Sequence, residues 1–248
     1  MPEMTRVREN REGTMKTVAI VTAAGAGIRM GGEVAKQFLE FDGKPLLGVT
    51  LERFQRCPAI DAVIAVVPSE TVGFCKKEIV DAFGLTKVIK VVAGGARRQD
   101  SVRAGIEASE GDYGLIVIHD GVRPLVDDEL IGRTVGAAKR FRAVITALPA
   151  KDTVKQVGED GLVERTYDRR QVWLVQTPQA FRYEDILNAH RRALQEGWND
   201  VTDDALLMER MGIPVKVIEG SEENIKITTP HDLDQALFLR TRERGRSI

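Results

Sequence analysis

The segment AAGAGIRMGGEVAKQF, residues 23–38, places four glycines and two cations directly after an apolar run. Its glycines, at 25, 27, 31 and 32, lack the spacing of a dinucleotide fingerprint, and no Gly-Lys-Ser/Thr ends the segment as in a Walker A loop. Backbone N–H groups exposed by glycines, beside Arg29 and Lys36, suit a polyphosphate. We therefore expect this loop to hold a triphosphate in a way that differs from both of these motifs. A plain strand-to-helix turn is the alternative.

The stretch VIHDGVRP, residues 117–124, adds an acid and a cation at the end of another apolar run. Ligands of open α/β sheets bind at the carboxyl ends of strands. Beside a polyphosphate, Asp120 is a candidate magnesium anchor, and its alternative role is a helix-capping or turn acid. Its position favours Arg123 over Arg97 and Arg98 as a ligand-binding arginine, although all three are equally consistent with solvated surface charges.

Two further segments have the residue types of a nucleotide site. Gly94 and Gly95 let the backbone approach a planar base, and Ser101 can donate or accept a hydrogen bond beside it; an ordinary turn explains them equally well. Lys226 lies within NIKIT, residues 224–228, which we expect to be a short strand. Its ammonium then reaches an anion, or extends to solvent from an edge strand.

Covalent catalysis has no candidate in this sequence. The histidines, at 119, 190 and 231, are not spaced as metal ligands or as a triad, and we interpret them as structural or surface residues. Cys57 and Cys75 lack metal-ligand spacing, and we expect both to be reduced, structural thiols.

Alternating strands and helices must position these residues. An α/β fold is predicted, with an open, mostly parallel, Rossmann-like sheet covered by helices on both faces. A helix is expected between Ser69 and Gly84, forming a βαβ crossover. Further helices are expected near 183–196, near 203–211 and from Thr229-Pro230, where Asp232 is the third residue. The expected strands are 17–23, 62–67, 88–93, 115–119, 143–148, 214–220 and 224–228.

After Leu148 the pattern changes to alternating polar and apolar residues around Glu159-Asp160-Gly161, a turn signal. We interpret residues from about 150 to 171 as a β-hairpin arm that projects from the sheet. The arm offers little apolar surface of its own, and an isolated two-stranded ribbon is only marginally stable. We therefore expect it to pack against a second chain in a two-fold homodimer.

The 248 residues carry a net charge of -1, with 43% hydrophobic and 29% charged residues. These proportions are typical of a globular protein and do not indicate a surface that coats nucleic acid or seeks membranes. Residues 1–16 are polar, without the apolar core of a signal peptide. We expect a flexible tail at 1–16, a single domain at 17–248 and a cytoplasmic location, with neither nucleic acid nor membrane as partner.

Six motifs, in unbroken order from about Thr17 to Leu239, carry a family resemblance. They are AAGAGIRM, AKQF, HDGVRP, DRRQVWLVQTPQAF, TDDA and NIKITTPHDL. Together they resemble the 2-C-methyl-D-erythritol 4-phosphate cytidylyltransferases of the non-mevalonate isoprenoid pathway. The resemblance implies a homodimeric enzyme that uses Mg²⁺ and transfers CMP from CTP to methylerythritol phosphate, releasing pyrophosphate.

The resemblance also implies residue roles. Arg29, Lys36 and Lys226 match the catalytic cations, of which the first two contact the triphosphate, and Asp120 matches the residue at the metal. Gly95 and Ser101 are expected near cytosine. Thr153 and Arg169, on the arm, match residues that reach the sugar phosphate bound in the partner subunit. The substrate-binding residues implied are Ala23, Ala24, Gly25, Gly95, Ser101, Asp120, Arg123, Thr153, Arg169 and Thr202.

The sequence departs from the family pattern without losing a functional side chain at Ala35, where proline is common, and at Gly121, where alanine is common. Ala96 stands where some members have aspartate, so base recognition must rest on the backbone and neighbouring residues. One alternative is ribitol-phosphate cytidylyltransferase, whose members share AAG, KQF and HD, although DRRQVW resembles the methylerythritol enzymes more. A non-catalytic nucleotide-sensing module is the other alternative, and retention of Arg29, Lys36 and Lys226 argues against it.

Overall fold

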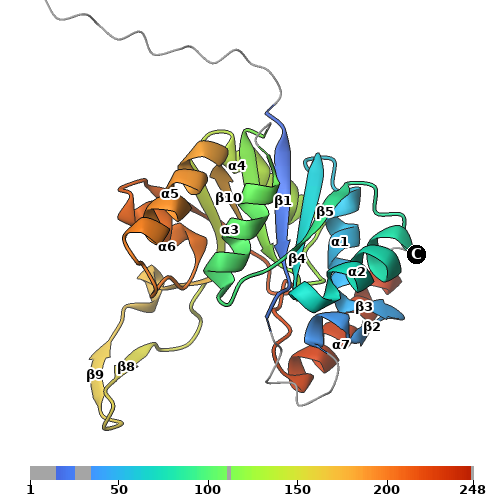
Figure 1. Ribbon diagram of the computed structural model, residues 1–248. Coiled ribbons are helices and arrows are strands. Elements are labelled where there is room, and N and C mark those ends of the chain that lie inside the picture. Colours follow the sequence, from blue (N-terminus) through green and yellow to red (C-terminus); the bar gives the residue numbers. More distant parts are fainter. Residues whose placement is uncertain (1–14, 26–34, 111–112, 247–248) are drawn as a thin grey trace, which may run out of the picture.

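The computed structural model describes residues 15–25, 35–110 and 113–246, in which seven strands form one sheet in the order β11-β7-β10-β6-β1-β4-β5 (Figure 1). All neighbouring pairs are parallel except those of β10, which runs antiparallel to both β6 and β7. The predicted Rossmann-like α/β class is thus confirmed. The strands are β1 (Thr17–Thr22), β4 (Ala62–Val67), β5 (Val88–Ala93), β6 (Leu115–Asp120), β7 (Ala143–Pro149), β10 (Trp173–Arg182) and β11 (Val215–Glu219).

Helices cover both faces of the sheet because its central strands are apolar on both sides. Ala19 and Val21 of β1 pack with α1 (Leu46–Arg56), the helical segment around α2 (Val72–Phe74) and α4 (Asp128–Ala138). The alternate residues Val18 and Ile20 pack instead with α3 (Arg98–Ala108), α5 (Tyr183–Gln195) and α6 (Asp204–Arg210). Such two-sided burial explains the continuous apolar runs of the sequence.

The crossover between β4 and β5 is helical, as predicted, but its winding changes along its length. It begins as the 3₁₀ turn η3 (Ser69–Thr71), continues as α2 and becomes the π-helix η4 (Cys75–Asp81). Ser69 was expected to cap this helix, yet its side chain makes no capping bond and contacts Glu70 instead. Gly84, with φ of 60°, ends the segment in the left-handed conformation that glycine tolerates best.

The predicted arm is a separate two-stranded sheet, β8 (Lys155–Val157) paired with β9 (Val163–Thr166), and it projects well away from the main sheet (Figure 1). Gly161 has a φ of 80° in its turn, as the Glu-Asp-Gly signal predicted. The short 3₁₀ helix η5 (Arg169–Gln171) then leads the chain into β10. All residues of both arm strands are exposed.

Two expectations about strands need correction. Residues 173–182 were not among the expected strands, yet directly after the predicted arm they form β10 of the main sheet. Residues 224–228 are not a strand: Ile227 donates its backbone N–H to Val122 O, 2.9 Å away, but no ladder forms. Ile227 is wholly buried and Ile225 half-buried on the same side, and this gives an extended segment the periodicity of a strand.

A small third core supports that segment. It joins Phe41 of β2 (Glu40–Phe41) to Val122, Ile227 and Ala236, the last on α7 (Pro230–Arg246). The hairpin formed by β2 and β3 (Lys44–Pro45) lies beside α7 in Figure 1. As η2 (Lys36–Phe38) leads directly into β2, the segments that carry Lys36 and Lys226 share this one foundation.

Ion pairs and a cap fix α7. Arg53, buried on α1, binds the Glu243 carboxylate through two nitrogens, each at 2.6 Å, and donates from Nε to Pro124 O at 3.1 Å. Thr229 and Asp232 form the predicted cap, in which each side chain accepts from the other's backbone N–H. Among the described residues, no helix is long and apolar enough to cross a membrane. Cys57 and Cys75 are buried, free thiols.

Candidate active site

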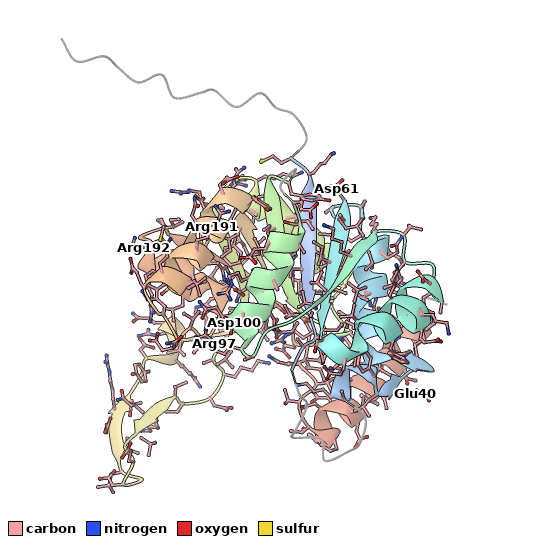
Figure 2. All side chains as sticks on the ribbon, viewed as in Figure 1. Glu40, Asp61, Arg97, Asp100, Arg191 and Arg192 are labelled. Atoms are coloured by element: carbon pink, nitrogen blue, oxygen red, sulfur yellow. The ribbon has the colours of Figure 1, made fainter. Side chains whose placement is uncertain are left out.

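The carboxyl edge of the sheet brings the chemistry-bearing segments together. The loop after β1, the glycines after β5 and the end of β6 are tied to neighbouring strands by backbone hydrogen bonds, of which Ala23 N to Val66 O is 2.7 Å and Gly121 N to Thr22 O is 2.8 Å. In Figure 2, Arg97 and Asp100 mark this edge at the lower end of α3, and Asp61 marks the opposite edge near the start of β1. These segments, which lie far apart in the sequence, thus meet because the parallel strands end at the same edge of the sheet.

A first cavity of about 180 Å³ opens at this edge. Arg29, predicted to contact the triphosphate, lies outside the described residues. Eight other predicted site residues line the cavity, and they come from the loops after β1 and β5, from the end of β6, from η2 and α3, and from the segment before α7. They are Ala23, Ala24, Gly25, Lys36, Gly95, Ser101, Asp120 and Lys226.

Close packing explains the glycines on one wall of this cavity. A Cβ on Gly94 would overlap the Ala24 Cβ and lie 2.7 Å from Ser101 Oγ. Ser101, 3% exposed, accepts a hydrogen bond from Gly95 N at 3.2 Å and donates to Arg97 O at 3.1 Å. The wall therefore presents backbone and one fixed hydroxyl rather than flexible side chains, as suits recognition of a planar group.

A second cavity, of about 460 Å³, lies on the other side of Asp120. Its walls include Arg123 and Thr202, both predicted as substrate-binding, and Thr177 and Gln179 of β10, which the sequence did not indicate. Arg98, Asp120 and Lys226 line both cavities and form the wall between them. A molecule in either space would meet the same three charged side chains.

Asp120 is the centre of that wall, and three cations surround it. Lys226 Nζ is 2.9 Å from Oδ2, Arg123 Nε is 3.5 Å from Oδ2, and Arg98 Nε is 3.5 Å from Oδ1. Burial by itself would raise the pKa of Asp120, but the charges of Lys226, Arg98 and Arg123 outweigh burial and hold it well below its usual range. The carboxylate is therefore ionised, and the local charge is net positive.

His119 fixes the backbone around Asp120. Burial lowers the pKa of His119 to about 4, so the imidazole is neutral at physiological pH. Its Nε2 lies 3.2 Å from Arg123 O, which only accepts, so this nitrogen carries the proton. Thr177 Oγ1 then donates to Nδ1, 3.1 Å away, and accepts from Asp120 N at 3.0 Å. His119 is structural, as expected.

The sequence favoured Arg123 over Arg98 as a ligand-binding arginine, and the structure places both beside Asp120. Arg123 does lie beside Asp120, but Arg98 lies equally near it and also binds Asp204, with Nη1 2.7 Å from Oδ2. Arg97 lines the first cavity but is exposed and paired with Asp100 rather than with Asp120. His190 is wholly buried against Asp204, whereas His231 is exposed. Only the TDDA motif hinted at Asp204, and no spacing linked it to Arg98.

Thr153 and Arg169 are exposed on the arm and line neither cavity. Arg169 donates from Nη1 to Lys151 O at 2.7 Å. Among the described residues, no group of three or more His, Cys, Asp or Glu side chains could hold a metal ion. Asp120 is the carboxylate common to both cavities.

A mostly parallel sheet that gathers cations around one ionised carboxylate at its carboxyl edge is typical of α/β proteins that bind phosphorylated small molecules. A sequence model of the 2-C-methyl-D-erythritol 4-phosphate cytidylyltransferase family matches residues 17–242. The chain belongs to this family, whose members are nucleotidyltransferases.

Individual relatives agree over nearly the whole chain. The 2-C-methyl-D-erythritol 4-phosphate cytidylyltransferase of Syntrophus aciditrophicus is 47% identical over 231 residues, which is 93% of this chain and 98% of that protein. Its counterpart in Geobacter metallireducens is 46% identical, covering 88% of this chain and 95% of that protein. A crystal structure of 4-diphosphocytidyl-2C-methyl-D-erythritol synthase from Anaerococcus prevotii superposes with a TM-score of 0.81 at 34% identity, covering 92% of this chain and all of that one.

Proposed function

We infer that this chain transfers the cytidylyl group of CTP to 2-C-methyl-D-erythritol 4-phosphate, forming 4-diphosphocytidyl-2-C-methyl-D-erythritol and pyrophosphate. The supporting observation is the shared wall of Arg98, Asp120 and Lys226 between two cavities. A reaction between two phosphorylated molecules needs adjacent sites whose phosphates meet, and it needs cations at the meeting point. This wall has both properties.

We assign CTP to the first cavity. Lys36 reaches it from η2, and Ala23, Ala24 and Gly25 line it beside the sheet edge. The N–H of Ala23 is bound to Val66 O, so we propose the N–H groups of Ala24 and Gly25 for the triphosphate. Gly95 and Ser101, in the same lining, suit the cytosine ring. Arg29 is proposed to bind the triphosphate with Lys36.

We assign methylerythritol phosphate to the second cavity, with Arg123 and Thr202 as its ligands. Arg123 is 8% exposed, and its Nη1 donates to Asn224 O at 2.7 Å, which holds the guanidinium in place. Lys226 and Asp120 face this substrate as well as CTP. The phosphate of the polyol would therefore lie next to the α-phosphate of CTP.

The proposed chemistry requires no general base, because the attacking group is already a phosphate oxyanion. One phosphate oxygen bonds to the α-phosphorus of CTP, and the bond to pyrophosphate breaks in line. Negative charge gathers on the α-phosphate oxygens in the transition state. Lys36, Lys226 and Arg29 are the cations proposed to offset it, and the wall holds Lys226 in advance of the reaction.

We propose that Asp120 holds Mg²⁺ with oxygens of the substrate phosphates. Mg²⁺ in phosphoryl-transfer sites is usually bound by one or two carboxylates, substrate oxygens and water, and a single ionised carboxylate facing both cavities fits that donor set. When bound, the ion supplies further charge neutralisation on the phosphates. Lys226 would then have to share the carboxylate with the ion, since it already lies 2.9 Å from Oδ2.

We propose that the arm joins two copies of the chain in a homodimer, with Thr153 and Arg169 reaching the sugar phosphate in the partner. Val157, Leu162 and Val163 on the arm are each more than half exposed. Exposed apolar side chains continue onto β10 at Trp173 and Leu174. A ribbon of this kind is stabilised by a neighbour, and two-fold symmetry makes the exchange reciprocal. The single domain at 17–248, the flexible tail at 1–16 and the cytoplasmic location stay predictions from the sequence.

Pyrophosphate release from purified protein tests the proposed function. CTP with methylerythritol phosphate should give the highest kcat/KM, above CTP with ribitol phosphate and above UTP with methylerythritol phosphate. Faster turnover of ribitol phosphate would transfer the assignment to that enzyme class. Binding of CTP without pyrophosphate release on any polyol phosphate would indicate a nucleotide-sensing module.

A further inference from the structure

A buried chain of side chains leads from α5 to the wall between the two cavities. His190 of α5 lies 3.2 Å from Asp204 of α6 through Nε2 and Oδ1, and Asp204 Oδ2 lies 2.7 Å from Arg98 Nη1. His190 is wholly buried and Asp204 is 1% exposed. Neither is among the residues that line these two cavities, whereas Arg98 lines both. Arg98 is the side chain that joins this buried chain to both cavities.

The hydrogen-bonding requirements of this chain define its state. Burial would raise the pKa of Asp204, but the charge of Arg98 and the hydrogen bond from His190 hold it below its usual range. An ionised carboxylate only accepts, so Nε2 of His190 carries a proton. Both oxygens of Asp204 then have donors, and its carboxylate is held from two sides.

Arg98 is bound more tightly to Asp204 than to Asp120. The contact with Asp204, at 2.7 Å, is a normal charge-assisted hydrogen bond, whereas Nε is 3.5 Å from Asp120 Oδ1. The long contact is the one that a substrate phosphate could replace, because Asp120 has Lys226 and Arg123 as further partners. The guanidinium is thus fixed at its buried end and available at the end facing the cavities.

We propose that His190 is a positioning residue for the reaction: through Asp204 it orients Arg98, which supplies a fixed positive charge where the two substrate phosphates meet. The proposal rests on the proposed function of this site. Without the donor at Nε2, Asp204 can rotate and Arg98 loses its fixed anchor. A displacement of about 1 Å in such a group costs on the order of 100-fold in rate.

Two substitutions of similar polarity distinguish a role of His190 as hydrogen-bond donor to Asp204 from a role in packing alone. His190→Gln places an amide nitrogen near the position of Nε2, and His190→Asn is too short to reach Asp204. We expect His190→Asn to lower kcat about 10- to 100-fold with little change in KM for CTP, and His190→Gln to retain most of the activity. Leu187→Ala, a buried change on the same helix, should lower the melting temperature without changing kcat of the folded enzyme.

Combination with Arg98→Met gives the decisive measurement. If His190 acts through Arg98, His190→Asn has no further effect on kcat once Arg98 is methionine, so the two losses are not additive. Losses that multiply would overturn the proposal, as would equal kcat for His190→Gln and His190→Asn. Failure of the wild-type chain to release pyrophosphate from CTP and methylerythritol phosphate would instead contradict the proposed function. If His190→Asn does not fold, Asp204→Asn replaces it in the double-mutant cycle with Arg98→Met. The two losses in kcat should again be non-additive.

Discussion

Lys226 Nζ lies 2.9 Å from Asp120 Oδ2, and this ion pair joins the segment before α7 to the last residue of β6. The Lys226 side chain is 40% exposed, whereas that of Asp120 is 9% exposed. The pair therefore has a buried anionic half and an accessible cationic half. A bound phosphate can reach the ammonium without displacing the carboxylate.

Replacing Lys226 with methionine should lower kcat about 100- to 1000-fold, because a preorganised positive charge is lost where negative charge develops. Lys226→Arg keeps the charge and serves as the matched control, with a smaller loss expected. Steady-state pyrophosphate release measures both variants. A normal kcat accompanied only by a raised KM would assign Lys226 to ground-state binding.

Lys36→Ala should also lower kcat strongly, and more than it raises KM for CTP, if Lys36 contacts the α-phosphate in the transition state. Lys44→Ala is its control, because Lys44 is ion-paired with Glu52 and lines neither cavity. Initial rates at varied CTP separate the two parameters. An effect of Lys36→Ala confined to KM would refute a transition-state role.

Mixing subunits tests the arm. Lys36→Ala damages the site on its own chain, whereas Arg169→Ala is expected to damage the site of the partner. A mixed dimer then carries both lesions in one site and none in the other. With random exchange about half of the dimers are mixed, and about a quarter of wild-type activity should return. No recovery above the separate variants would place Arg169 in the site of its own chain.

Gly94→Ala should raise KM for CTP, because the added methyl group would overlap Ala24 and approach Ser101 in the proposed nucleotide cavity. Gly136→Ala is the contrasting change, since a Cβ there meets nothing within 4 Å on an exposed turn of α4. It should stabilise the fold by about 0.5–1 kcal/mol and leave KM unchanged. Thermal unfolding and CTP titrations distinguish the two variants. An unchanged KM for Gly94→Ala would show that the cytosine does not bind beside Gly94.

Acid should weaken the docking of α7. Hydrogen bonds from Arg53 lower the pKa of Glu243 from 4.5 to about 2, against the effect of burial, and Arg240 adds to the lowering. A carboxylate with a depressed folded-state pKa stabilises the fold above about pH 4.5, and this contribution is lost as the pH falls towards 2. Since the side chain is 36% exposed, the contribution is about 1–2 kcal/mol at neutral pH. The difference in unfolding free energy between wild type and Glu243→Gln should therefore shrink between pH 5 and 2. A difference in unfolding free energy that stays constant between pH 5 and 2 would contradict this role of Glu243.

Sequence patterns predicted that the candidate site residues gather at the carboxyl edge because Asp120 and the glycine segments end or follow apolar runs, and parallel strands end together. The patterns could not place Arg98 in the site. Its partner Asp204 lies 106 residues away, and His190 meets Asp204 only because α5 packs on α6. No periodicity encodes such a meeting.

Alternating residues posed a different difficulty. An extended segment buried on one side has a period of two whether or not it pairs with a strand. Residues 224–228 have this pattern because α7 and β2 cover one side, not because a ladder exists. The same ambiguity hid β10, because its alternation continues that of the arm and residues 173–182 were not expected to be a strand of the main sheet.

The insertion of β10 between β6 and β7 constrains the order in which the chain can fold during synthesis. Residues 17–120 supply four adjacent strands, β6-β1-β4-β5, which can assemble first. β7 cannot join them, because in the described structure it pairs only with β10 and β11, both of which are translated later. Until Arg182 has left the ribosome, β6 is an apolar edge strand without its antiparallel neighbour. A nascent or truncated chain that ends before this residue exposes a surface prone to aggregation.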